Sequence, residues 1–248
     1  WPCEVYRNYS EHNLGLKQRV SSGLNWVFNH VDRAIILEDD CIAHPDFFKF
    51  SETLLDLYYE DLRVSAITGN NFQNGKWRGD ASYYFSKYPH CWGWATWKRA
   101  WQQYKGNIPF WSEWSKSDAW LKHTTDKIER NYWKHIFQMV QEEKIDSWAY
   151  PWTASVWYKN GLTATPNINL VSNIGFGLNA THTKNKNSRS NNIPTQKIGV
   201  LKHPKIVQRY LEADRYTFDN HFNGKHLRYP YNLINFPIRV VKYFYLKI

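Results

Sequence analysis

Three consecutive carboxylates, Glu38, Asp39 and Asp40, are the side chains of this sequence best suited to do chemistry. They follow an apolar run at 34–37 that has the length of a buried strand, and they precede a helical segment. Ligands of an open α/β sheet bind at the carboxyl ends of its strands. Adjacent carboxylates repel one another unless a cation or hydrogen-bond donors offset them, so the triplet suits a hard metal ion that holds a phosphate. The alternative is a solvated acidic turn that caps the next helix.

The segments around the triplet alternate between strand and helix. Val20, Leu24, Phe28 and Val31 recur at helical spacing. Their alternation with strands predicts an α/β fold whose central sheet is mostly parallel and covered by helices. We expect strands at 3–6, 34–37, 63–68 and 82–88, helices at 45–59, 118–143 and within 147–160, two extended runs in 162–173 broken at Pro166, and a polar loop at 184–192.

The composition of the 248 residues limits the classes of partner. Thirty-two Lys and Arg against 22 Asp and Glu give a net charge of +10, which suits a sugar nucleotide, an anionic membrane surface or a nucleic acid. The acidic triplet counts against nucleic acid, so no such partner is expected. The 18% aromatic content exceeds what a core needs and suits clefts that stack sugars or bases.

Cysteine usage and hydropathy indicate a cytoplasmic protein. Cys3, Cys41 and Cys91 are odd in number and form no Cys-x-x-Cys, so neither a disulfide framework nor a zinc site is indicated. No uninterrupted apolar stretch approaches the roughly 20 residues that cross a bilayer. The tail at 233–248 mixes bulky apolar and basic residues, which suits either packing on the body or peripheral contact with the cytosolic face of a membrane.

Four motifs, taken in order, carry a resemblance. The segments LEDDCIAHPDFF, GWATWKRAW, SWAYPWTASVW and LVSNIGFGLNATHT resemble a family of bacterial nucleotide-sugar glycosyltransferases with the GT-A fold, which is Rossmann-like. The chain is more distantly similar to N-acetylglucosaminyltransferase I, which has the same Glu-Asp-Asp followed by Pro-Asp-Phe-Phe. The resemblance covers about residues 1–222.

The resemblance implies roles for the donor side of the site. Asp40 would bind Mn²⁺ or Mg²⁺, with His182 near the metal, and the metal would stabilise the nucleoside diphosphate as it leaves. Glu38 and Asp39 would hydrogen-bond hydroxyls of the donor sugar or ribose. The donor nucleotide would lie against the loop and first turn that contain Asn13, Gly15 and Lys17, with Arg19 offering further positive charge. A plain turn before a helix explains the loop equally well.

The acceptor side is expected among the tryptophans. Trp92, Gly93 and Trp94 would form a wall of the sugar cleft together with Trp148, since indole faces stack on sugars and glycine lets the backbone approach. We expect Trp92 and Trp94 to be the more exposed of the aromatic block. The competing interpretation, core packing, is favoured for the two tryptophans at 97 and 101.

One departure from the family pattern affects the catalytic base. Relatives often carry aspartate at the position of Ala149, and an inverting transfer needs a carboxylate there to take the proton of the acceptor hydroxyl. Alanine cannot do this. Either Asp146 takes over the role, or another base does, or this copy is catalytically impaired.

The expected organisation is a single domain at 1–222, with a nucleotide and metal half at about 1–80, an acceptor half at about 81–222, and a basic, aromatic tail at 223–248. Residues 1–5 look like the second strand of such a fold, so about one βα unit is expected to be missing upstream.

The expected function is metal-dependent transfer of a sugar, by inverting chemistry, from a nucleoside diphosphate sugar, with a UDP-sugar as the expected donor. The acceptor would be a glycan or a lipid-linked saccharide in cell-surface polysaccharide synthesis. The alternative is an impaired sugar-nucleotide or glycan-binding protein on a transferase scaffold.

Overall fold

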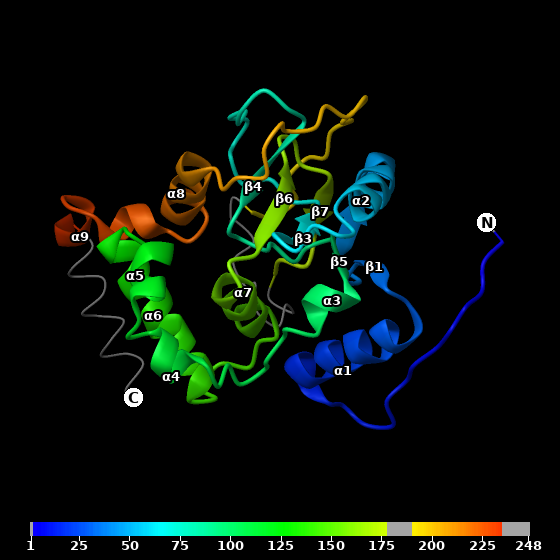
Figure 1. Cartoon of the computed structure of the whole chain (residues 1–248), viewed down its shortest axis with the longest axis horizontal. Helices are drawn as coiled ribbons and strands as arrows, with labels where there is room; N and C mark the ends of the chain where they lie inside the picture. The colour runs from blue at the N-terminus through cyan, green and yellow to red at the C-terminus, as the bar shows by residue number, and fades with distance from the viewer. Residues whose placement is uncertain (1, 178–189, 235–248) are drawn as a thin grey trace.

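A mixed sheet of five strands forms the centre of the molecule (Figure 1). The structure is a computed structural model that describes residues 2–177 and 190–234. Only β3 and β6 pair in parallel, and the three other neighbouring pairs are antiparallel. The α/β class is therefore confirmed, and the prediction of a mostly parallel, Rossmann-like sheet is wrong. The strand order is β1 (Arg33–Ile36), β5 (Trp94–Trp97), β3 (Val64–Thr68), β6 (Leu162–Pro166) and β4 (Tyr83–Ser86).

The aromatic block of the sequence accounts for the error. It supplies β5, which lies between β1 and β3 and is antiparallel to both. All four residues of β5 are buried, so they show no alternation of apolar and polar residues that would mark a strand. Because β5 opposes both neighbours, β1, β3 and β6 point the same way, and their carboxyl ends lie at one end of the sheet.

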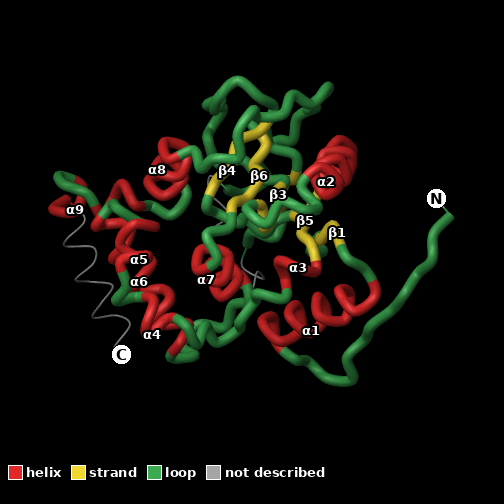
Figure 2. Tube along the Cα trace, in the orientation of Figure 1, coloured by secondary structure: helices red, strands yellow, loops and turns green. Residues whose placement is uncertain are grey.

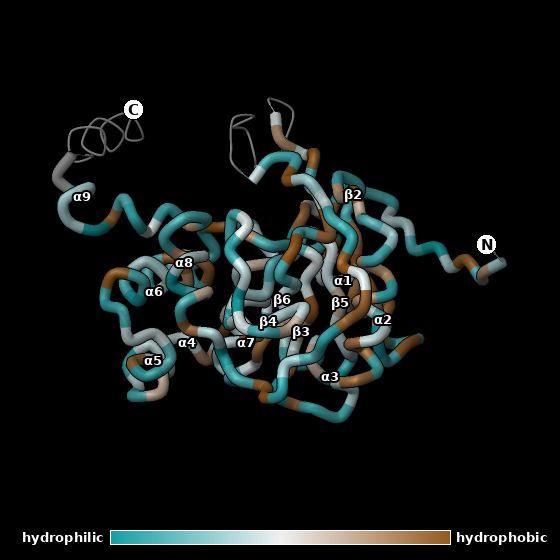
Figure 3. Tube along the Cα trace, turned by 90° about the horizontal axis from the view of Figure 1, so that it is seen from above, coloured by the Kyte–Doolittle hydropathy of each residue, from teal (hydrophilic) through white to brown (hydrophobic). Residues whose placement is uncertain are grey.

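The helices flank the sheet on two sides. Helices α1 and α2 lie to one side of the strands, and α4, α5, α6 and α8 lie to the other (Figures 1 and 3). The bounds are α1 (Gly15–His30), α2 (Pro45–Leu57), α3 (Lys98–Trp101), α4 (Trp111–Trp114), α5 (Asp118–His123), α6 (Lys127–Gln141), α7 (Ala149–Tyr158), α8 (Leu211–Asn220), η1 (Gly224–Leu227) and α9 (Tyr231–Ile234).

Most expected elements occur close to their predicted positions. The helix expected at 118–143 is instead two helices, because Asp126 accepts hydrogen bonds from the backbone N–H groups of Ile128 and Glu129 and so begins α6 anew. The strand expected at 3–6 is absent, and residues 2–14 contain no helix or strand (Figure 2). The polar loop expected at 184–192 lies largely outside the described residues.

A two-stranded ribbon holds the segment after the acidic triplet against the sheet. It consists of β2 (Cys41–Ala43) paired antiparallel with β7 (Val171–Asn173). The Gly69 N–H donates to the carbonyl of Gly93 at 2.8 Å. A Cβ on Gly69 would lie 2.4 Å from Cγ2 of Val171, and one on Gly93 would lie 2.6 Å from the same atom. The Val171 side chain therefore occupies space that a Cβ at either glycine would fill.

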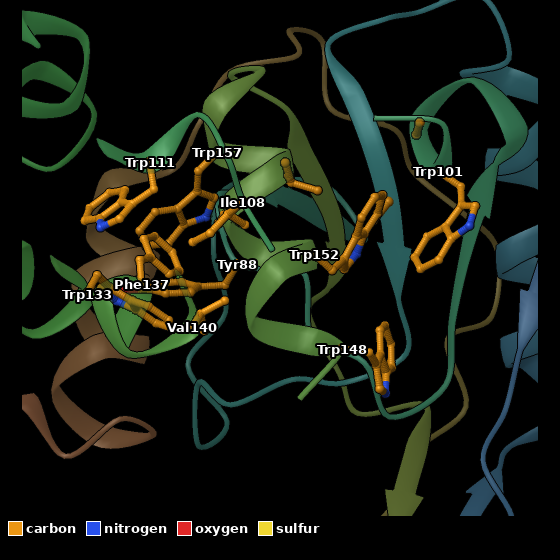
Figure 4. Packing of buried hydrophobic residues seen from close by; sticks show 14 of the residues in the cluster. Tyr88, Trp101, Ile108, Trp111, Trp133, Phe137, Val140, Trp148, Trp152 and Trp157 are labelled. Carbon is orange, nitrogen blue, oxygen red and sulfur yellow. The ribbon is translucent and has the colours of Figure 1, made fainter. Parts of the chain in front are cut away.

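Most of the tryptophans belong to the core. Ten of the 14 tryptophans are buried, most of them in one cluster between the sheet and helices α4 to α7 (Figure 4). A second cluster lies under α2 and contains Phe47, Phe50 and Leu54. Because most of the tryptophans are packed in the core, tryptophan content alone is no evidence for sugar stacking.

The C-terminal tail is described only in its first part. Arg228 makes ion pairs with Asp126 at 2.7 Å and with Asp219 at 2.8 Å, so the segment around η1 is tied to α6 and α8. Residues 235–248, with most of the expected membrane-contacting segment, lie outside the described residues. Among the helices that are described, none has both the length and the apolar character needed to cross a bilayer.

Candidate functional site

The acidic triplet lies where β1 ends, as the sequence predicts. The Cys41 N–H donates to the carbonyl of Glu38 at 3.1 Å, which turns the chain from β1 into β2. The Ile174 N–H donates to the carbonyl of Asp40 at 2.9 Å and joins this turn to the end of β7. Asp39 is exposed, whereas Glu38 and Asp40 are half-buried.

Negative charge accumulates at this turn. Burial, together with the charges of Asp40 and Asp39, raises the pKa of Glu38 to about 7, against a hydrogen bond from the Trp148 indole that lowers it. Among the described residues, no lysine or arginine forms an ion pair with any of the three carboxylates. A cation would relieve this repulsion, and an acidic turn that only caps a helix would not need to bury Glu38.

The surroundings of Asp40 fit a divalent ion in part. Its carboxylate packs against Gly175, where a Cβ would lie only 2.0 Å from Asp40 Oδ2, so only glycine leaves room for this carboxylate. The Gly175 N–H donates to Asn173 Oδ1 at 2.9 Å, which fixes the backbone there. Within 2–177 and 190–234, no three His, Cys, Asp or Glu side chains converge as a metal-binding group. The described residues around Asp40 would thus supply only part of a coordination shell for such an ion. His182 lies outside the described residues.

Asp146 lies beside the start of α1. A Cβ on Gly15 would be 3.6 Å from Asp146 Oδ2, and the Gly15 N–H donates to Asn13 Oδ1 at 2.8 Å. Gly15 has a φ of +73°, which favours glycine at this turn. The structure therefore brings together the expected nucleotide loop and the expected base, which are far apart in the sequence.

The basic residues of the first turns of α1 differ in their contacts. Lys17 is half-buried, and its Cε would lie 3.6 Å from a Cβ on Gly106. Arg19 Nη1 donates to Asn8 Oδ1 at 2.8 Å, and Nη2 donates to the carbonyl of the same residue. Arg19 thus anchors the N-terminal segment, and Lys17 is the cation at the start of α1 that the described contacts leave for a ligand.

Trp148 connects the two parts of the site. Its indole hydrogen-bonds Glu38, and it lies two residues after Asp146 at the start of α7. Ala149 is the first residue of that helix and is half-buried. Glu38 and Asp146 are therefore positioned by the same short segment, at the end of the sheet to which β1, β3 and β6 point.

The tryptophans of the predicted sugar cleft lie at different depths. Trp94 is 1% exposed and Trp148 is 2% exposed, and their rings stack with centroids 5.5 Å apart. The expectation that Trp94 is exposed is wrong, because it is a residue of β5 that faces the core. Gly93 is buried too. Trp92 is half-buried, with its ring 5.6 Å from that of Phe72 and 5.5 Å from that of Phe176, so it is the one tryptophan of these three with ring surface left for a ligand.

Two neighbours of the site were missed in the sequence. Asn70, just after β3, accepts from the Trp92 N–H at 3.1 Å and donates to the carbonyl of Val171 at 3.2 Å. Cys91 lies near enough to Glu38 that this carboxylate, after burial, helps to raise the pKa of its thiol. The Gly-Asn-Asn run that follows the strand expected at 63–68 was the available signal for Asn70, because polar side chains at a strand's carboxyl end often face a ligand.

Comparison with known proteins adds no assignment to this geometry. A scan against models of protein families matches none, and a search of curated proteins finds no match either.

Proposed function

We propose that the chain is a metal-dependent glycosyltransferase that moves a sugar from a nucleoside diphosphate sugar to a glycan or lipid-linked saccharide of a cell-surface polysaccharide. The observation that carries this proposal is the pair of repelling carboxylates Glu38 and Asp40 just after β1. The Trp148 indole, which hydrogen-bonds Glu38, joins this pair to the segment that places Asp146 beside the start of α1. The common direction of β1, β3 and β6, which puts their carboxyl ends at one end of the sheet, supports a ligand site there.

On this proposal the residues divide between holding the donor and activating the acceptor. Asp40 would hold Mn²⁺ or Mg²⁺, whose charge stabilises the departing diphosphate when it is bound. Glu38 and Asp39 accept hydrogen bonds from donor hydroxyls, while Asn13, Gly15 and Lys17 contact the nucleotide and its phosphates. Trp92 offers ring surface to a sugar.

Asp146 is the carboxylate best placed to act as base, since Ala149 carries no titratable group. It is exposed, lies beside the start of α1, and is two residues before Trp148, whose indole hydrogen-bonds Glu38. In an inverting transfer it takes the proton of the acceptor hydroxyl while that oxygen bonds to the sugar carbon and the nucleoside diphosphate leaves. Ala149 supports a second candidate, a protein that binds the donor without turnover.

Isothermal titration with a panel of nucleoside diphosphate sugars, with and without Mn²⁺, tests the donor site. We expect saturable binding that requires Mn²⁺, is lost in Asp40→Ala, and is unchanged in Glu52→Gln, which removes an exposed carboxylate on α2. Release of nucleoside diphosphate on addition of acceptor then separates an enzyme from a binding protein. Binding that does not depend on the metal or on Asp40 contradicts the proposal.

A further inference from the structure

A cleft of about 520 Å³ opens at the other edge of the sheet, along β4. The segment at 202–210 runs beside this strand and is bonded to it at two places. The Ser82 N–H donates to the carbonyl of Lys202 at 2.8 Å, and the Tyr210 N–H donates to that of Phe85 at 2.7 Å. Seven residues of the segment lie between these anchors, against two residues of the strand, so the segment bows away and leaves the cleft. β1, which the acidic triplet follows, is the opposite edge strand.

Two arginines with fixed orientations line the cleft. Arg78 is 5% exposed, and its Nε donates to Gln73 Oε1 at 2.8 Å. Arg209 donates from Nε to Asp214 at 2.5 Å and from Nη1 to the carbonyl of His123 at 2.8 Å. In neither guanidinium does Nη2 have a hydrogen-bond partner among the described residues. Guanidinium groups held in place in this way suit the oxygens of a phosphate.

An exposed carboxylate competes for one of these arginines. Glu212 Oε1 accepts from Arg78 Nη1 at 2.7 Å, while its own side chain is 74% exposed. Such a pair contributes little to stability, because solvent screens it and the glutamate can turn away into water. A ligand phosphate could therefore replace Glu212 on Arg78 at small cost, and Lys205 adds a further cation to the lining.

The rim of the same cleft is apolar. Ile206 is 67% exposed and Leu211 is 66% exposed, and both belong to the lining. Tyr84 and Tyr210 form an edge-to-face pair at 6.0 Å in the wall. Exposed aliphatic side chains beside a cationic floor suit a ligand that carries an anionic head and an apolar body.

We propose that this cleft binds the phosphate group of an amphiphilic ligand, with the phosphate on Arg78 and Arg209 and the apolar part on Ile206 and Leu211. Its residues are separate from those of the proposed transferase site. The same phosphate chemistry occurs in a lipid headgroup and in a small soluble phosphate, and the apolar rim selects the amphiphile.

Titration calorimetry with dihexanoyl phosphatidic acid, below its micelle concentration, tests the cleft. We expect saturable binding that Arg78→Gln weakens by about tenfold or more, because a charge-assisted hydrogen bond is lost. Glu212→Gln should tighten binding a few-fold by removing the competitor. Arg63→Gln, which removes an exposed arginine paired with Asp61, should change nothing. If neither Arg78→Gln nor Glu212→Gln changes the affinity, or if phosphatidic acid does not bind at all, the proposal is overturned.

Further measurements distinguish an amphiphilic phosphate from a soluble one and keep the proposal testable if a variant misfolds. Ile206→Ser should weaken binding of phosphatidic acid and leave that of inorganic phosphate unchanged. Inorganic phosphate that binds as tightly as the amphiphile would overturn the choice of ligand.

If Arg78→Gln fails to fold, Glu212→Gln and Ile206→Ser still test the proposal, since both change exposed side chains. Asp40→Ala should bind phosphatidic acid as the unaltered protein does, so failure here is distinct from failure of the transferase proposal.

Discussion

At the scale of single residues, the position of the base is the sharpest question. Asp146 is exposed beside Gly15, while the half-buried start of α7 carries the methyl group of Ala149. If Asp146 takes the acceptor's proton, Asp146→Asn should lower kcat by about a hundredfold or more, because general base catalysis contributes about that much. Donor binding should be unchanged, since this carboxylate does not hold the donor.

Steady-state kinetics together with donor titration would measure this difference. Glu143→Gln is the matched control, because it removes an exposed carboxylate three residues earlier in the chain. An unchanged kcat in Asp146→Asn would assign the proton to another group.

The same scale shows what side-chain chemistry alone could predict. The acidic triplet was found because three adjacent carboxylates after an apolar run are a local pattern, and the structure puts them where β1 ends. The burial of Trp94 could not be predicted from a local pattern of this kind. Its burial depends on which strands flank β5, and that pairing joins residues about 30 and 60 positions away along the chain.

At the scale of elements, the contact of Val171 with Gly93 ties β7 to the start of β5. Gly93→Ala should destabilise the fold by about 2–4 kcal/mol, from its left-handed φ of +69° and from overlap with the valine. Gly75→Ala is the control, because φ is +79° there but no atom lies within 4 Å of the new Cβ. It should cost only about 1–2 kcal/mol.

A double-mutant cycle isolates the overlap. Val171→Ala alone removes buried methyl groups, whereas on the Gly93→Ala background it also relieves the clash, so it should cost less there. Free energies of unfolding in urea give the coupling energy. Equal costs on the two backgrounds would show that the valine does not set the requirement for glycine.

Elements were easier to predict than their directions. The helix at 45–57 was predicted well because proline at its first turn and a regular apolar face are encoded locally. Strand direction is set by pairing between distant segments, and the continuous burial of β5 gave no alternation to reveal a strand. The break between α5 and α6 was missed, although Asp126 is an ordinary N-cap residue.

At the scale of the whole molecule, three half-buried histidines make stability depend on pH. Burial lowers the pKa of His221 to about 4, and it lowers those of His90 and His123 well below their ordinary value. Between pH 6.5 and 4 the unfolded chain therefore binds protons that the folded chain does not, so the free energy of unfolding falls as the pH falls. His221 alone should cost about 2 kcal/mol at pH 5.

Urea unfolding at pH 7 and pH 5 would check this dependence. His221→Phe keeps a ring beside Phe72, whose centroid is 3.8 Å from that of the histidine. This variant should lose about 2 kcal/mol less than the unaltered protein over the same change of pH. His12→Gln, at an exposed position, should show the full loss. An equal loss in His221→Phe would mean that His221 takes up its proton in the folded state.

The tryptophan cluster has an optical consequence. Trp148 stacks on Trp94, and Trp94 lies 5.5 Å from Trp152 and 6.3 Å from Trp101, ring centre to ring centre. Indoles this close exchange excitation energy faster than they emit light, so fluorescence from the cluster belongs to the group and to no single ring. Trp148 also touches Glu38. A cation that arrives at the acidic turn therefore changes the field on one member of the group, and the emission of the core reports its arrival without any added dye.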